Sequence, residues 1–273
     1  MLRFSTLLLL LTLSSLSRAE LVIEITRGAD DALPIAVVPF SGTQASDNIG
    51  SIIKADLERS GRFRALPDNQ LPAQPDSSTG LNYAQWQSIG TNHLVVGSSK
   101  TTADGRYEIR FELLSLDRKT RLLGEALTVP ASQWRDAAHF AADRIFETIT
   151  GARGIFATKI LYVNQYPHNG KVRYRLELAD ADGFRPLSIL DSPEPILSPG
   201  WSPDGRKVAY VSFESGRPAI YTQNIATQQR TRIASFSGLN GAPTWSPDGG
   251  RMALTLSRDG NPEIYIMDVA TQA

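Results

Sequence analysis

The stretch Trp201-Ser202-Pro203-Asp204-Gly205 returns 44 residues later as Trp245-Ser246-Pro247-Asp248-Gly249, and this repeat decides the fold. Ser-Pro-Asp-Gly suits a type I turn, because proline fixes φ at the second position and glycine is favoured at the fourth. The run Lys207-Val208-Ala209-Tyr210-Val211 follows, is apolar at consecutive positions, and therefore expects cover on both faces of its strand. Strand-rich units that recur every 40 to 45 residues or so are typical of β-propeller blades, and we expect the tryptophans to fill the space between blades.

The repeat divides residues 153–273 into three predicted blades. One period before Trp201, strand-like runs without the signature indicate a first blade near 155–200, followed by blades near 201–244 and 245–273. The third repeat ends about 15 residues short of its period, and an arc of fewer than three blades would leave apolar sheet faces in water. We therefore expect a piece of a longer propeller, with about two and a half blades present.

Residues 33–152 follow a different pattern and predict an α/β domain. Leu33 to Phe40 is a short apolar run suited to a buried strand. After it, Asp47 is placed to cap a helix whose isoleucines and Leu57 recur every three or four residues, and Gly61 is placed to end it. The other expected elements are helices over 83–89 and 133–150 and strands over 94–98, 107–116 and 122–129.

The first 19 residues predict a secretory signal peptide. Arg3 provides a basic start, Leu7 to Leu13 forms the apolar run, and cleavage is expected after Ala19. An uncleaved anchor is the alternative, but the apolar run is shorter than the roughly 18 to 20 residues that a membrane span needs. The chain is therefore expected in the periplasm, and because it contains no cysteine its stability must come from a packed core.

The charge balance argues against nucleic acid as a partner. The chain has 28 basic and 28 acidic residues, and loss of residues 1–19 removes two arginines and leaves 26 basic residues. Nucleic acid or an acidic membrane surface would require a basic excess. Short basic clusters such as Arg118-Lys119 are interpreted as solvated turns.

No pattern typical of catalysis or metal binding occurs in the sequence. His93, His139 and His168 are far apart and show no Glu-x-x-His spacing. The run Asp180-Ala181-Asp182-Gly183 begins like a calcium loop but lacks its later ligands, so it is interpreted as a hairpin turn. Because nucleophile elbows and phosphate loops are also missing, we expect no catalytic, cofactor-binding or metal-binding residue, no cofactor and no small-molecule substrate. These patterns favour a protein that binds other proteins.

The order of segments resembles the TolB family of the Gram-negative Tol-Pal envelope system. The residues that carry the resemblance are Glu20 to Ile25, the strand Pro34-Ile35-Ala36-Val37-Val38-Pro39-Phe40, and the two Trp-Ser-Pro-Asp-Gly repeats. The pentapeptide occurs in many propellers, whereas its combination with the strand is far more specific. The resemblance implies a periplasmic protein with an α/β domain and a six-bladed propeller. It also implies two protein partners, the inner-membrane protein TolA and the outer-membrane lipoprotein Pal.

The resemblance places TolA binding at the mature amino terminus. The residues themselves allow this, because an extended segment could add as a strand to an exposed sheet edge of the partner. The alternative, an edge strand or tail docked on the chain's own α/β domain, stays open. The expected TolA-binding residues are Glu20, Leu21, Val22, Ile23, Glu24 and Ile25, within an extended segment over 20–32.

Pal binding is placed on the propeller face, at the loop before the third blade. The sequence departs from the family pattern at the first residue of this loop, where relatives often carry histidine. A blade-connecting turn without a partner is the alternative, because Asn-Gly is a common turn pair. The expected Pal-binding residues are Leu239, Asn240, Gly241, Ala242 and Pro243.

The function that the resemblance implies is an adaptor that links TolA to Pal, supports outer-membrane integrity, and assists constriction during cell division. The alternative is the propeller of a prolyl-oligopeptidase-like serine peptidase, whose hydrolase domain would lie beyond Ala273. A nucleophile elbow downstream would favour the peptidase, whereas further blades and a stop would favour the adaptor.

Overall fold

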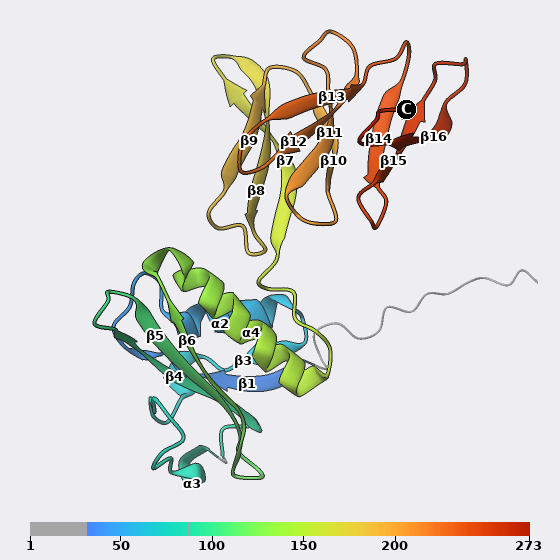
Figure 1. The fold of residues 1–273 in the computed structure, drawn as a ribbon. Coiled ribbons are helices and arrows are strands. Elements are labelled where there is room, and N and C mark those ends of the chain that lie inside the picture. The colour runs from blue at the N-terminus through green and yellow to red at the C-terminus, as the bar shows by residue number, and fades with distance from the viewer. Residues whose placement is uncertain (1–31, 87) are drawn as a thin grey trace, which may run out of the picture.

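The structure is a computed structural model that describes residues 32–86 and 88–273. Figure 1 shows a mixed α/β body and a body built from strands, joined by the segment that follows helix α4 (Trp134–Thr150). The predicted fold class, an α/β domain followed by an all-β propeller arc, is confirmed. The signal peptide expected over 1–19 and nearly all of the extended segment expected over 20–32 lie outside the described residues.

The α/β body is a six-stranded sheet with two helices packed on one face. Its strands are β1 (Leu33–Val37), β2 (Ser41–Gly42), β3 (Phe63–Ala65), β4 (His93–Thr101), β5 (Tyr107–Ser115) and β6 (Thr120–Val129). Its other elements besides α4 are the helices α2 (Ile49–Arg59) and α3 (Tyr83–Trp86) and the 3-10 turns η1 (Asp68–Gln70) and η2 (Ala131–Gln133). The strand order is β3-β1-β4-β5-β6, with β2 paired to β4. Strand β1 is parallel to both of its neighbours. Strands β4, β5 and β6 form the expected antiparallel meander.

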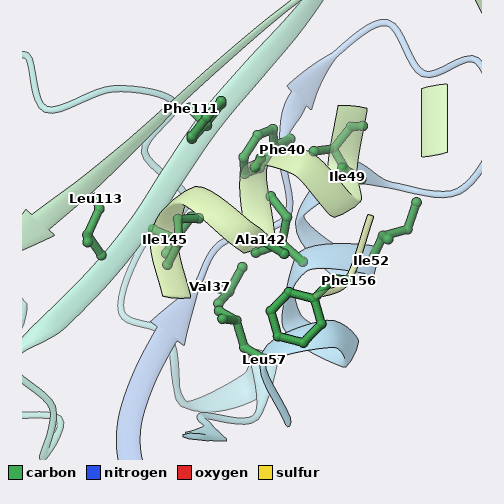
Figure 2. Packing of buried hydrophobic residues seen from close by; sticks show 14 of the residues in the cluster. Val37, Phe40, Ile49, Ile52, Leu57, Phe111, Leu113, Ala142, Ile145 and Phe156 are labelled. Atoms are coloured by element: carbon green, nitrogen blue, oxygen red, sulfur yellow. The ribbon is translucent and has the colours of Figure 1, made fainter. Parts of the chain in front are cut away.

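The core of the α/β body lies between the sheet and helices α2 and α4. Val37 of β1 and Phe111 of β5 pack with Leu57 of α2 and Ile145 of α4 (Figure 2). The opposite face of the sheet is covered by the segment around α3, whose Trp86 is fully buried. Cover on both faces explains why the chain around β1 is apolar at consecutive positions.

Helix α2 is capped by Asn48, so the expectation that Asp47 caps it is wrong. The Oδ1 atom of Asn48 accepts hydrogen bonds from the backbone N–H groups of Gly50 and Phe40, both at 2.9 Å. Its amide nitrogen donates to the Phe40 carbonyl at 2.9 Å. An amide side chain can bind both groups of the entering chain, which a carboxylate cannot, because a carboxylate only accepts.

Helix α4 starts one residue after its expected beginning and ends as expected at Gly151, whose φ is 73°. Glycine is favoured there because the left-handed conformation carries no steric cost without a Cβ atom. No helix in the described residues has both the length and the apolar character of a membrane span.

The strand body contains three antiparallel sheets, each formed by consecutive strands. The first has three strands, β7 (Lys159–His168), β8 (Lys171–Asp180) and β9 (Leu187–Ser192). The second has four strands, β10 (Ile196–Trp201), β11 (Lys207–Ser212), β12 (Ala219–Asn224) and β13 (Arg230–Ala234). The third has three strands, β14 (Asn240–Trp245), β15 (Arg251–Leu256) and β16 (Glu263–Asp268).

Strand β11 shows how the sheets depend on one another. Val208 and Tyr210 point toward the first sheet and belong to a cluster with its Leu176. Ala209 and Val211 point the other way and pack with residues of the third sheet. Successive side chains of a strand face opposite ways, so the consecutive apolar run fills two interfaces at once, as predicted.

The two tryptophans of the repeat lie between neighbouring sheets, as expected. Trp201 packs on the cluster shared by the first and second sheets, and Trp245 on the cluster shared by the second and third. Both are only partly buried. Trp201 lines an open groove of about 490 Å³ with Leu178 and Ile225, so its indole ring keeps contact with solvent.

The sheets begin earlier than the sequence repeat suggests. The second sheet starts at Ile196, because the Ser-Pro-Asp-Gly turn joins its first two strands rather than separating two blades. The backbone N–H of Gly205 donates to the Ser202 carbonyl at 2.9 Å, as a type I turn requires, and the bond from Gly249 to Ser246 repeats it at 2.9 Å. The turn chemistry was therefore predicted correctly, whereas its place within the sheet was not evident from the sequence.

Replacing Trp201 by alanine should destabilise the strand body by about 3 kcal/mol, the lower end of the range for buried aromatic residues, because the ring is only partly buried. Urea unfolding monitored by circular dichroism measures this loss. The exposed Ile264, with 78% of its surface accessible, provides the control, and its replacement by alanine should cost less than about 0.5 kcal/mol. A loss below about 1 kcal/mol for Trp201→Ala would mean that the ring contributes little to packing.

Candidate functional site

Of the two predicted binding segments, only one can be located. Glu20 to Ile25 lies outside the described residues, so its role stays a prediction. The second segment begins at Leu239, in the connection between β13 and β14, and continues as the first residues of β14. The Asn240-Gly241 pair is therefore the start of a strand and does not form the turn considered as the alternative.

The second segment presents one apolar side chain on a firmly held backbone. Asn240 is 1% exposed; its Oδ1 accepts from Phe236 N at 2.9 Å, and its Nδ2 donates to the carbonyls of Phe236 at 2.8 Å and Gly238 at 3.2 Å. The backbone N–H of Leu239 donates to Ser257 Oγ at 2.7 Å. The Leu239 side chain is 42% exposed, so the loop is anchored on both sides of a residue that faces solvent.

A bulge interrupts β14 just after this point and recurs in β10. Ala242 has a φ of 47° and precedes Pro243, and the pairing with β15 shifts there. Ser198 of β10 has a φ of 49°, precedes Pro199, and lies beside the same kind of shift. The two positions are 44 residues apart, so the structural repeat extends upstream of the tryptophan. The prolines at this spacing are the signal that the sequence analysis missed.

A buried cluster of polar and charged side chains lies where the two bodies meet. His139 of α4 is 1% exposed and its Nδ1 lies 2.7 Å from Oδ2 of Asp56 in α2. On the other side of the ring, Nε2 faces Asp182 at 3.6 Å and Asp180 at 3.9 Å, both from the hairpin between β8 and β9. Arg135, one turn before His139 on α4, pairs with Asp182 and with Asp47, the latter at 2.8 Å. Spacing by four places both side chains on one face of the helix.

A second set of ion pairs extends this cluster to the surface. Arg185 of the strand body binds Asp136 of α4 at 2.6 Å and Asp180 at 2.7 Å, and Lys159 pairs with the same two carboxylates. The hydrogen bonds from Arg185 hold the pKa of Asp136 below its usual value. Burial raises the pKa of Asp180, but hydrogen bonds from Arg185 and Lys159 outweigh this effect and lower it. Both carboxylates are therefore ionised and paired at neutral pH.

The cluster contains donor types that metal ions use. One ligand atom each from Asp56, His139 and Asp182 lies within 4.8 Å of the others. However, the two carboxylates lie on opposite sides of the imidazole ring, and Arg135 already pairs with Asp182. This arrangement suits a network of ion pairs better than a cation site, because the positive charge of Arg135 already balances Asp182. The absence of a metal site stays a prediction.

The residues of this cluster carry few signs of their association in the sequence. The hairpin turn predicted for Asp180 to Gly183 is confirmed, with a φ of 85° at Gly183. His139 was set aside because it shows no Glu-x-x-His spacing, yet α2 and the hairpin bring three carboxylates to it. The spacing of Arg135 and His139 on one helix face was the available signal.

Comparisons with known proteins agree over most of the chain. The family model described as the TolB amino-terminal domain matches residues 21–122, and the model described as the TolB beta propeller domain matches residues 146–273. The Tol-Pal system protein TolB of Alcanivorax borkumensis is 50% identical over 83% of this chain and 52% of its own length. That of Xanthomonas oryzae pv. oryzae is 46% identical over 86% of this chain and 54% of its own length.

A solved structure is also similar to this chain over most of its length. The crystal structure of TolB from Acinetobacter baumannii has a TM-score of 0.82 and is 45% identical, covering 92% of this chain and 61% of that one. The chain thus spans about half the length of the curated relatives it matches.

Replacing Asp56 by alanine should cost about 1 to 3 kcal/mol, because it leaves the buried imidazole of His139 and the guanidinium of Arg59 without their hydrogen-bond acceptor. Asp191 offers a matched control, since it also pairs with two cations, Arg173 and Arg175, but is 34% exposed. Asp191→Ala should cost about 1 kcal/mol or less. Urea unfolding of both variants tests the contrast, and equal losses would show that the His139 cluster contributes no more than a surface ion pair.

Proposed function

Because this chain belongs to the TolB family, we propose that it is part of a periplasmic adaptor that links TolA at the inner membrane to Pal at the outer membrane. In this role it supports the integrity of the outer membrane and its constriction during cell division. Its partners are proteins, with no cofactor, nucleic acid or small-molecule substrate. Relatives at 46 to 50% identity are named as Tol-Pal system proteins, which favours the adaptor over a peptidase propeller.

The observation that carries the proposal is the exposed Leu239 on its anchored loop. A binding surface gains affinity when its backbone is already ordered, because less conformational entropy is lost on association. The hydrogen bonds of Asn240 and the contact of Leu239 N with Ser257 provide this order. Leu239 is therefore assigned as an apolar contact for Pal, in the place where relatives often use histidine.

The location of the loop suits an adaptor with two partners. Leu239 precedes β14, whereas Trp245 at the other end of β14 lies near the turn that starts at Ser202. Trp201 and Lys159 lie at the same end of the sheets as Trp245. Lys159 is the first residue of β7 and directly follows the link to the α/β body, so this end faces that body. Leu239 thus lies at the end of the sheets away from the α/β body. Pal could occupy that end while TolA binds the segment before β1.

Replacing Leu239 by aspartate should weaken Pal binding by about tenfold or more, equivalent to roughly 1.4 kcal/mol, because a charge replaces the apolar contact. Isothermal titration with purified Pal measures the effect. Leu187, 49% exposed on β9, is the matched control, and Leu187→Asp should leave the affinity unchanged. Equal affinities for both variants would remove Leu239 from the Pal surface.

Deleting Glu20 to Ile25 should abolish capture by the carboxy-terminal domain of TolA, because this segment supplies the added strand. The thermal melt should stay nearly unchanged, since the described core begins at β1. A pull-down with the mature chain and the deletion variant tests this, and capture that survives the deletion would contradict the assignment. Pal binding of the deletion variant serves as the control for an intact strand body.

A further inference from the structure

The two bodies meet through charged side chains rather than through a shared apolar core. In residues 32–86 and 88–273, each of the four hydrophobic clusters lies either within the α/β body and its linker or within the strand body. The contacts across the junction are instead the ion pairs described above. The α/β side contributes Arg135, Asp136 and His139 from α4, and the strand side contributes Lys159, Asp180, Asp182 and Arg185.

This set of seven side chains, called the latch below, is complementary in detail. Asp136 faces two cations of the strand body, Arg185 and Lys159. Arg135 faces Asp182 and is stacked on Phe184, with its guanidinium carbon 3.9 Å from the ring centre. Each body thus carries both a cation and a carboxylate that pair with the opposite charge on the other body. These pairs form together in one relative position of the two bodies.

The segment that links the two bodies is hydrogen-bonded to the α/β body at one end and to the strand body at the other. On the α/β side, Asp143 of α4 accepts hydrogen bonds from the N–H groups of Phe156 at 2.6 Å and Ala157 at 3.1 Å, and Phe156 is buried in the α/β core. On the strand side, Ala181 N donates to the Thr158 carbonyl at 3.1 Å. The N–H and Oγ1 of Thr158 also donate to the Ile155 carbonyl, at 3.3 Å and 2.6 Å, so Thr158 is bonded to both sides and is the residue at which the attachment changes from one body to the other.

Charged contacts of this kind separate more readily than an apolar interface. The cost of removing charges from water largely offsets their attraction, so paired ions contribute little net stability while they specify geometry. When the bodies part, water solvates the same groups, and the apolar surface that is exposed is mainly the ring of Phe184 that stacks on Arg135. The latch thus permits two arrangements, one paired and one hydrated.

We propose that the latch holds the α/β body and the strand body in one position and that its release lets them turn about Thr158. The inference concerns the junction alone and does not depend on the identity of the partners. It assigns Asp136 as a positioning residue, because it pairs with two cations across the junction without lying in either hydrophobic core.

The distance between the bodies tests the proposal. The chain has no cysteine, so Arg62→Cys and Ala226→Cys, both at exposed positions, allow one spin label on each body. Dipolar spectroscopy should give one narrow distance distribution in the doubly labelled chain. Adding Asp136→Lys places like charges across the junction, and the distribution should broaden and shift. Adding Arg185→Glu to that variant restores opposite charges and should narrow the distribution again.

Asp191→Lys is the matched control, because it makes the same change beside two arginines that lie within the first sheet. It should leave the distribution narrow, and circular dichroism should show unchanged secondary structure in every variant. An unchanged distribution in Asp136→Lys would overturn the proposal, as would equal broadening in Asp191→Lys. A distribution that depends on zinc or on a chelator would instead identify the His139 cluster as a metal site and equally overturn it.

Discussion

The structure depends on the need of each β-sheet to cover two apolar faces. In β11, Val208 and Tyr210 serve one interface and Ala209 and Val211 the other, so the second sheet buries apolar side chains against both of its neighbours. The buried amide of Gln223 links the second sheet to the first, because its Nε2 donates a hydrogen bond to the Ile189 carbonyl at 3.0 Å. Apolar burial provides the driving force, while this hydrogen bond and the partly buried tryptophans fix how adjacent sheets align.

Local chemistry made much of the fold predictable. The Ser-Pro-Asp-Gly turns, the long helix ending at Gly151 and the meander after β1 all follow from residue types that restrict φ or from a clear periodicity. The boundaries of the sheets were harder, because a repeat in sequence shows its period but not which strand comes first. The choice between Asp47 and Asn48 as helix cap was also beyond the sequence, since it depends on the path of the chain at Phe40.

The candidate sites were predictable to different degrees. The position of Leu239 could be inferred from the order of blades, whereas the anchoring role of Asn240 depends on a loop geometry that no local pattern reveals. The junction cluster is the clearest case of what sequence alone leaves hidden. His139, Asp56 and Asp182 are far apart in the chain and meet only because two helices and a hairpin converge. Pairings of this kind carry no periodic signal, because each partner comes from a different element.

The anchoring of the loop at Leu239 separates two tasks that binding surfaces often combine. The side chains of Asn240 and Ser257 hold the backbone of this loop by hydrogen bonds. Neither of them bonds to the exposed side chain of Leu239. Substitution at this one position can therefore alter which surface is recognised without disturbing how the polypeptide folds. A single substitution there changes the chemistry that the surface offers, while the hydrogen bonds that order the polypeptide stay in place.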